Sequence, residues 1–188
     1  MSTHRVLLLL ILLAGAGGTR ADEAAAWAAL RHGGAVALMR HADAPGGVGD
    51  PPGFRLDDCS TQRNLSAQGR EDAKAAGRRW KAQKVVVGRL LSSPWCRCVD
   101  SARLMDLGTP RLEPAFGNVV VWSDRRDALT AGARRLIAAW QGPGNLLVVT
   151  HGANIAALTG INPMSSEALV LTVQPDGSLR EHGRIAAP

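Results

Sequence analysis

Tyrosine is absent from the 188-residue chain, phenylalanine occurs twice, and aromatic residues make up only 4% of the sequence. Nucleic-acid-binding domains usually concentrate Lys and Arg on one element and place aromatic side chains among them. Here the 22 basic residues outnumber the 16 acidic ones only modestly, and they are spread along the chain. The composition therefore argues against a nucleic-acid partner and leaves an anionic small substrate or an anionic surface open.

Long hydrophobic runs are also missing. The longest, Val6–Ala14, has nine residues, about half of what crosses a bilayer core. A basic residue precedes it and the small residues Gly15–Ala21 follow it, which is the layout of a secretory signal peptide. We expect residues 1–21 to be removed, with cleavage after Ala26 or a retained anchor as alternatives. The domain at residues 22–188 would then be periplasmic or secreted, with no stable membrane anchor.

Several common catalytic signatures do not occur. The chain has no Gly-x-Ser-x-Gly elbow, no Walker loop and no Gly-x-Gly-x-x-Gly fingerprint. A zinc site needs at least three His, Cys or carboxylate ligands around one point. His41 and His151 have no close-spaced third ligand beside them, so we expect neither a metal nor another cofactor.

Apolar residues make up 46% of the chain and recur in short runs that alternate with helical patterns. This alternation predicts an α/β fold: a single-domain three-layer sandwich whose mostly parallel sheet carries helices on both faces. A Gly- and Pro-rich stretch, Arg40–Asp58, predicts a long irregular loop. The expected strands are Ala35–Met39, Val85–Leu91, Leu146–Thr150 and Leu169–Val173, with a further apolar run at Val119–Trp122. The expected helices are Ala67–Ala82 with Ser66 as its cap, Arg97–Leu107, Arg125–Gln141 and Asn154–Leu158.

Basic residues follow three of these strands. Arg40 and His41 end the first strand, His151 follows Leu146–Thr150, and Arg97 lies just after the second strand. Each alone is more often structural or solvated than functional, but all three lie where an open α/β sheet places its ligand crevice. Guanidinium groups and a helix N-terminus bind phosphate oxygens well. The pattern therefore predicts a cationic pocket for a tetrahedral dianion.

The same segments resemble a known family. Arg40-His41-Ala42, the Ser92-Ser93-Pro94 segment leading to Arg97, and His151-Gly152 are similar to motifs of the histidine phosphatase (phosphoglycerate mutase-like) superfamily. The usual Arg-His-Gly is Arg-His-Ala here, and Leu65–Gly69 matches the superfamily's helix-opening element. Residues 58–66 and 154–160 resemble an exported branch similar to lipopolysaccharide core heptose phosphatases. The resemblance spans Val36–Val173.

The resemblance implies roles for particular residues. His41 would be the nucleophile that forms a phosphohistidine, with Arg40, Arg97 and His151 holding the phosphoryl oxygens. From their place in the chain alone, we expect Thr61, Gln62 and Arg63 to line the rim of the site, with Gln62 binding the substrate.

A carboxyl group often protonates the leaving group in this superfamily. Glu113 lies in a segment similar to the superfamily's Glu-containing element and is the best candidate for this general acid, with Asp124 and Glu167 as weaker ones.

The implied function is an exported phosphomonoesterase acting on a small phosphorylated substrate, such as a phosphosugar or a phosphate of a surface glycan. A phosphomutase or a non-catalytic binder of phosphorylated surface glycan are the alternatives.

In an oxidising compartment we expect Cys59 to pair with Cys96 and Cys98 to stay buried. Pairing of Cys59 with Cys98, or three free thiols, remain alternatives.

Overall fold

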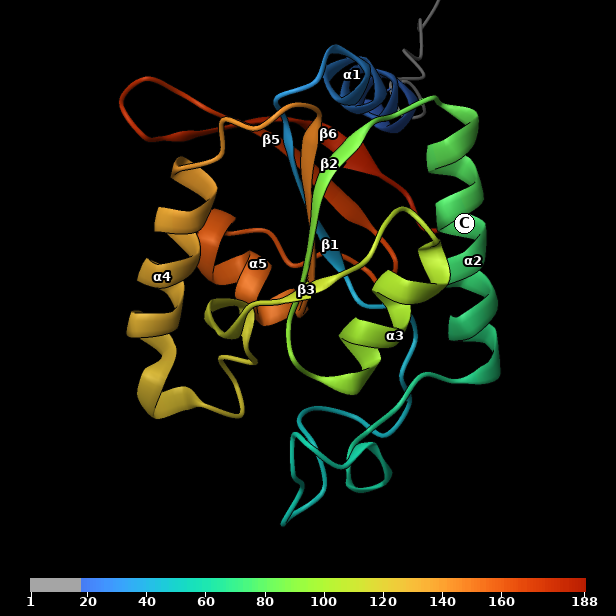
Figure 1. Cartoon of the computed structure of the whole chain (residues 1–188), viewed down its shortest axis with the longest axis vertical. Helices are drawn as coiled ribbons and strands as arrows, with labels where there is room; N and C mark the ends of the chain where they lie inside the picture. The colour runs from blue at the N-terminus through green and yellow to red at the C-terminus, as the bar shows by residue number, and fades with distance from the viewer. Residues whose placement is uncertain (1–17) are drawn as a thin grey trace, which may run out of the picture.

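The computed structural model describes residues 18–188, so most of the predicted signal peptide lies outside the described residues. Within this part of the chain, six strands form one sheet in the order β3-β2-β4-β1-β5-β6 (Figure 1). Strands β3, β2, β4 and β1 are parallel, β5 is antiparallel to β1, and β6 is antiparallel to β5. The strands are β1 (Val36–Arg40), β2 (Val87–Ser92), β3 (Arg111–Leu112), β4 (Asn145–Thr150), β5 (Ala168–Val173) and β6 (Leu179–Ile185).

Helices cover both faces of this sheet, with α2 and α3 on one side and α4 and α5 on the other, while α1 lies across one end in Figure 1. The α-helices are α1 (Gly18–His32), α2 (Ala67–Ala82), α3 (Cys96–Met105), α4 (Arg126–Ala138) and α5 (Gly152–Thr159). Three short 3-10 helices join them: η1 (Cys59–Thr61), η2 (Pro114–Phe116) and η3 (Ser123–Arg125). The predicted three-layer α/β architecture is confirmed.

Two hydrophobic cores result from the alternation of side chains along the strands. In β1, Ala37 and Met39 face the core formed with α1, α2 and α3, which contains Trp80. The intervening Val36 and Leu38 face the second core, under α4 and α5. The sheet is therefore buried on both faces, which explains why its central strands are apolar throughout.

Helix α2 begins and ends at the predicted residues. The hydroxyl of Ser66 accepts a hydrogen bond from the backbone N–H of Gly69 at 2.9 Å and caps the first turn. Ala73, Ala76 and Trp80 are buried on one face, as the helical spacing predicts. Gly77 lies so close to α3 that an added Cβ would be 2.0 Å from the carbonyl oxygen of Met105.

Other segments differ from the expectations. The apolar run Val119–Trp122 forms a turn instead of a strand, because the side chain of Asn118 accepts hydrogen bonds from the backbone there. Residues 22–32, to which the sequence assigns no element, belong to α1 and bury Trp27 in the core. Strand β6 also has no counterpart in the expectations, since its sequence is mostly polar and only its Gly183 and Ile185 are buried. Among residues 18–188, no helix combines the length and apolarity that crossing a membrane needs.

Candidate active site

Two buried histidines meet at the carboxyl ends of β1 and β4. The parallel register pairs Arg40 with Thr150, so His41 and His151 each follow the last paired residue of neighbouring strands. The backbone N–H of His41 donates to the carbonyl of Thr150 at 2.9 Å. The ring centroids of the histidines are 5.5 Å apart, and the two residues are only 3% and 4% exposed. The sheet thus brings together two residues that are 110 positions apart in the sequence.

The ring of His41 is held as a neutral tautomer. Its Nδ1 lies 2.8 Å from the carbonyl oxygen of Ala42. Because a carbonyl only accepts, Nδ1 carries the proton and Nε2 keeps a free lone pair. Burial, together with the positive charges of Arg97, Arg40 and Arg63, lowers the pKa of His41 to about 3, against the opposing effect of the Ala42 hydrogen bond. His41 is therefore unprotonated and nucleophilic at neutral pH.

His151 is also held neutral. Its Nε2 lies 2.9 Å from the hydroxyl of Ser93, and its ring packs edge-on against Trp95 with centroids 5.4 Å apart. Burial lowers the pKa of His151 well below its ordinary value, and the neighbouring His41 adds to this effect. The sulfur of Cys98 lies 3.7 Å from Nε2, and burial raises the pKa of that thiol to about 12.

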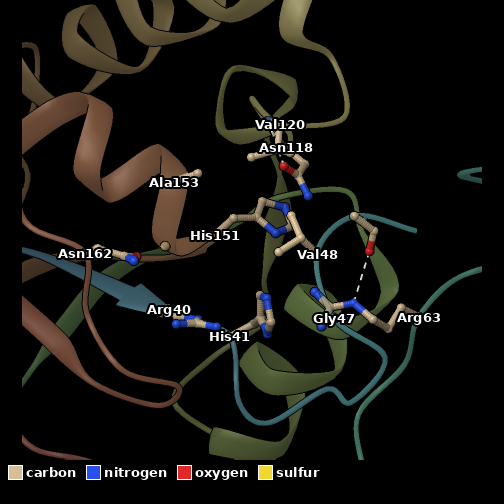
Figure 2. A pocket seen from close by; sticks show the side chains of 12 residues that line it. Arg40, His41, Gly47, Val48, Arg63, Asn118, Val120, His151, Ala153 and Asn162 are labelled. Carbon is tan, nitrogen blue, oxygen red and sulfur yellow. Dashed lines mark hydrogen bonds between the residues drawn. The ribbon is translucent and has the colours of Figure 1, made fainter. Parts of the chain in front are cut away.

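A cavity of about 180 Å³ opens over the two histidines. Its polar wall combines the side chains of Arg40, Arg63, Asn118 and Asn162 with the first two residues of α5 (Figure 2). The first N–H groups of a helix have no intrahelical acceptor, so this end of α5 attracts anions. None of the described residues lining the cavity is an Asp or Glu. The cavity is therefore cationic, and Arg40 and Arg63 carry its positive charge.

Arg40 enters the cavity from the end of β1. One of its Nη atoms donates to the carbonyl of Pro163 at 3.0 Å, which fixes the side chain and leaves other N–H groups available. A Cβ at position 152 would lie 2.4 Å from the side-chain oxygen of Asn162 and 3.3 Å from Cδ of Arg40. Gly152 is therefore required for the close approach of these three residues.

Arg63 is the second cation of the cavity, a position that the sequence indicates only by its place beside Gln62. Its Nε donates to the carbonyl of Gly49 at 3.0 Å, and its Nη1 donates to the carbonyl of Ala44. Figure 2 shows the guanidinium of Arg63 beside the cavity, across from Arg40. The long loop after β1 thus holds Arg63 in place through its backbone oxygens.

Arg97 does not line the cavity, although the sequence predicts that it holds phosphoryl oxygens. It is fully buried, and its two Nη atoms donate to the two carboxylate oxygens of Asp50 at 2.7 and 3.2 Å. Trp95 Nε1 donates to the same carboxylate at 2.9 Å. Burial raises the pKa of Asp50, but hydrogen bonds from Arg97 and from the backbone of Arg63 outweigh it and hold the pKa below its usual range. Asp50, which no sequence motif indicates, therefore pairs with the Arg97 guanidinium that was expected to bind phosphate.

Gln62 also lies outside the cavity lining. Its Nε2 donates to the carbonyls of Arg55 and Leu56 at 2.8 and 3.2 Å, while its Oε1 accepts from the backbone of Cys96 at 3.0 Å. All of its polar atoms are used to join the loop to the start of α3, so it is a structural brace in this conformation.

The structure brings none of the candidate acids to the cavity lining. Glu113 lies at the N-terminus of η2, where its carboxylate accepts from the backbone N–H of Ala115 at 3.2 Å. Glu167 accepts from the backbone of Met164 at 2.6 Å, and Asp124 is exposed in η3. The leaving-group side of the cavity therefore holds no carboxyl group from these three residues.

The predicted pairing of the cysteines is confirmed. A disulfide joins Cys59 to Cys96 and so links η1 to the first residue of α3, whereas Cys98 is a free, buried thiol. Because Cys96 adjoins Arg97, the bond fixes the loop close to the residues that surround His41.

The architecture and the site at its strand ends define a phosphoglycerate mutase-like fold. The solved protein histidine phosphatase SixA, complexed with tungstate, is 21% identical to this chain with a TM-score of 0.59, covering 81% of this chain and 96% of that one. A mycobacterial glucosyl-3-phosphoglycerate phosphatase is 18% identical with a TM-score of 0.58, covering 78% of this chain and 96% of that one. No protein-family model and no curated protein matches the chain.

Proposed function

We propose that this protein is a phosphatase that hydrolyses a phosphate monoester through a phosphohistidine on His41. The observation that carries the proposal is the neutral, buried imidazole of His41, with Nδ1 tied to a backbone carbonyl, at the floor of a cationic cavity. Nε2 would attack phosphorus while the bond from phosphorus to the leaving oxygen breaks. Water would then cleave the N–P bond, releasing inorganic phosphate and restoring the neutral ring.

The surrounding groups suit the charge of the transferred phosphoryl group. Arg40 and Arg63 flank the cavity, and the N–H groups at the start of α5 point toward it. Fixed donors of this kind contribute most when they are held in position before the reaction, because no reorganisation is then needed. The positive charge of Arg97 also acts on His41, although both of its Nη atoms donate to Asp50.

The solved structures with the same fold support this class of reaction. These structures include a protein histidine phosphatase and a glucosyl-3-phosphoglycerate phosphatase. We extend this to a small phosphorylated substrate, with a phosphosugar or a surface glycan phosphate as the specific proposal. The motif resemblance to lipopolysaccharide core heptose phosphatases supports that choice.

We also propose that the protein works in the periplasm or outside the cell. The pattern of residues 1–21 supports this, and so does the Cys59–Cys96 disulfide, because such bonds persist in oxidising compartments.

The decisive experiment compares the wild type with His41→Ala on p-nitrophenyl phosphate. We expect the wild type to release phosphate and to form an acid-labile phosphoenzyme, and the variant to do neither. His32→Ala is the matched control, since His32 is exposed at the end of α1, outside the cavity lining. A variant at His41 with near-normal rates would contradict the mechanism.

The same assay tests for a non-catalytic binder, which would retain phosphate affinity but release no phosphate from the substrate. A phosphomutase is tested by adding a sugar acceptor, to which it would pass the phosphoryl group faster than to water.

A further inference from the structure

Asn118 lies between the floor and the mouth of the cavity. It is only 5% exposed and lines the cavity together with the two histidines. Val120, two residues further on, is 43% exposed and marks the mouth, whereas His41 lies at the floor. In Figure 2, Asn118 and His41 lie on opposite sides of the cavity, with His151 between them.

The orientation of the Asn118 amide is fixed by its partners. Its Oδ1 accepts hydrogen bonds from the backbone N–H groups of Val120 and Val121, at 2.9 and 3.4 Å. Because both partners are donors, the atom facing them must be the oxygen. The Nδ2 group is therefore directed into the cavity, as Figure 2 shows, and it has no acceptor among the described residues.

The segment that carries Asn118 is held on both sides of it. The hydroxyl of Thr150 donates to the carbonyl of Phe116 at 2.9 Å. The side chain of Asn154 donates to the carbonyl of Gly117 at 2.7 Å and accepts from the backbone of Val119 at 3.3 Å. These contacts connect the segment to β4 and α5, which flank His151. The Nδ2 donor is thus fixed relative to the histidines before any substrate binds.

We propose that Asn118 Nδ2 donates a hydrogen bond to the leaving oxygen of the substrate. The inference rests on the proposed function, because an in-line attack by His41 Nε2 places the leaving oxygen on the opposite side of phosphorus. That side faces the mouth, and Asn118 lies between the floor and the mouth on the side opposite His41. As the N–P bond forms and the P–O bond breaks, the electron pair moves to the leaving oxygen, and the amide stabilises the charge that develops there.

This arrangement has a consequence for the class of substrate. An amide N–H can donate a hydrogen bond but does not give up its proton, so the departing oxygen takes its proton from water at the mouth. With no carboxyl group in the described lining, the site favours esters whose leaving oxygen is weakly basic. Aryl phosphates and phosphates at the anomeric oxygen of a sugar meet this condition better than simple alkyl phosphates.

Two variants of Asn118 test the proposal on p-nitrophenyl phosphate and phenyl phosphate, whose leaving groups differ in basicity. Asn118→Ser keeps a short oxygen that can accept from the following backbone N–H groups, but its hydroxyl is too short to reach the leaving oxygen. Asn118→Asp keeps the shape and the accepting oxygen and removes the donor. At pH 8 we expect kcat/KM on phenyl phosphate to fall by about 10²-fold in both variants. The loss on p-nitrophenyl phosphate should be several-fold smaller than that.

The outcomes separate this role from the alternatives. Equal losses of kcat/KM on both substrates, or wild-type rates in the variants, would overturn the role of Asn118. If circular dichroism shows that Asn118→Ser is unfolded, the result for Asn118→Asp decides. Glu113→Gln is measured in parallel, and a loss confined to the more basic leaving group in that variant would assign the role to Glu113 instead. If the wild type shows no turnover that depends on His41, both the proposed function and this inference are overturned. If the wild type turns over substrate but the Asn118 variants do so equally well, only this inference is overturned.

Discussion

Two arginines close to His41 have different hydrogen-bond partners. We therefore expect one of them to contribute to substrate binding and the other to the stability of the fold. Arg63 is fixed by backbone carbonyls and lines the cavity, while Arg97 forms a buried ion pair with Asp50. Removing a cavity donor costs activity, because the developing charge loses a fixed partner. Removing one member of a buried ion pair costs stability, because the other charge stays buried without a partner.

We therefore expect Arg63→Ala to lower kcat/KM by about 10²-fold with little change in the free energy of unfolding. Arg97→Ala should lower the free energy of unfolding by about 3–5 kcal/mol, measured by urea denaturation. The double variant Asp50→Ala/Arg97→Ala is the control and should recover much of that loss, since no unpaired charge remains. If the Arg97→Ala variant is as stable as the wild type but inactive, the result would instead support the original prediction that Arg97 binds phosphate.

The histidines predict how stability depends on pH. An unfolded His41 titrates near 6.5, whereas the folded ring has its pKa lowered to about 3. Between these values the unfolded chain binds a proton that the folded chain does not. The stabilisation is therefore complete above pH 6.5 and is lost as the pH falls, by up to about 1.4 kcal/mol per pH unit for each such histidine.

Urea denaturation at pH 7, 6 and 5 measures this slope. His41→Asn removes one titrating ring, so its free energy of unfolding should fall less steeply with decreasing pH than that of the wild type. The lowered pKa of Asp50 affects only more acidic solutions, below its ordinary value of 3.8. Parallel slopes in the two proteins would show that His41 is not buried as a neutral ring.

At the scale of elements, the loop between β1 and α2 carries the site and depends on cross-links that it forms with α3. The disulfide between Cys59 and Cys96 closes a separation of 37 residues. In the chain-entropy model, a closed loop of this size stabilises the folded state by about 3–4 kcal/mol. Gln62 and Asp50 join the same two segments through hydrogen bonds.

We expect the double variant Cys59→Ser/Cys96→Ser to lose about 3–4 kcal/mol of unfolding free energy. A reducing agent should destabilise the wild type by a similar amount and leave the double variant unchanged. If reduction left the wild-type denaturation curve where it was, the bond would not be formed in solution.

Local signals explain which elements were predictable from the sequence. Helix α2 was confirmed residue for residue, because a capping serine and buried residues at helical spacing lie within the segment itself. The meeting of His41 and His151 was also predictable, because each follows an apolar run at a strand's carboxyl end, although the register between β1 and β4 comes from the structure. The path of the loop could not be predicted, since Asp50 meets Arg97 and Trp95 only after the sheet has placed α3. Asn118 was missed for the same reason: its amide acquires a direction only when the following turn forms.

At the scale of the whole molecule, the predicted boundary between the proposed signal peptide and the folded domain is open to a direct test. Helix α1 buries Ala26 and Trp27, and Glu23 forms an ion pair with Arg79 of α2 while accepting from the ring N–H of Trp27. Cleavage after Ala26 would remove Glu23 and a buried alanine, whereas cleavage after Ala21 would keep both.

We expect the exported protein to begin at Asp22, as mass spectrometry of the periplasmic or secreted material would show. A chain that starts at residue 27 should melt several degrees below one that starts at residue 22, because buried contacts of α1 are lost. Equal melting temperatures would mean that the first turns of α1 contribute nothing to stability.

The docking of α1 on β6 joins the two ends of the chain. The absence of a side chain at Gly183 lets the helix approach so closely that a Cβ there would lie 2.1 Å from the carbonyl oxygen of Asp22. Asp22 and Gly183 are 161 positions apart in the sequence, so α1 meets β6 through a contact of very long range. Contacts this distant in sequence form late and slowly, so we expect α1 to dock on β6 late in folding. For the export proposed above, this delay would keep α1 undocked while the chain passes unfolded through a translocation channel.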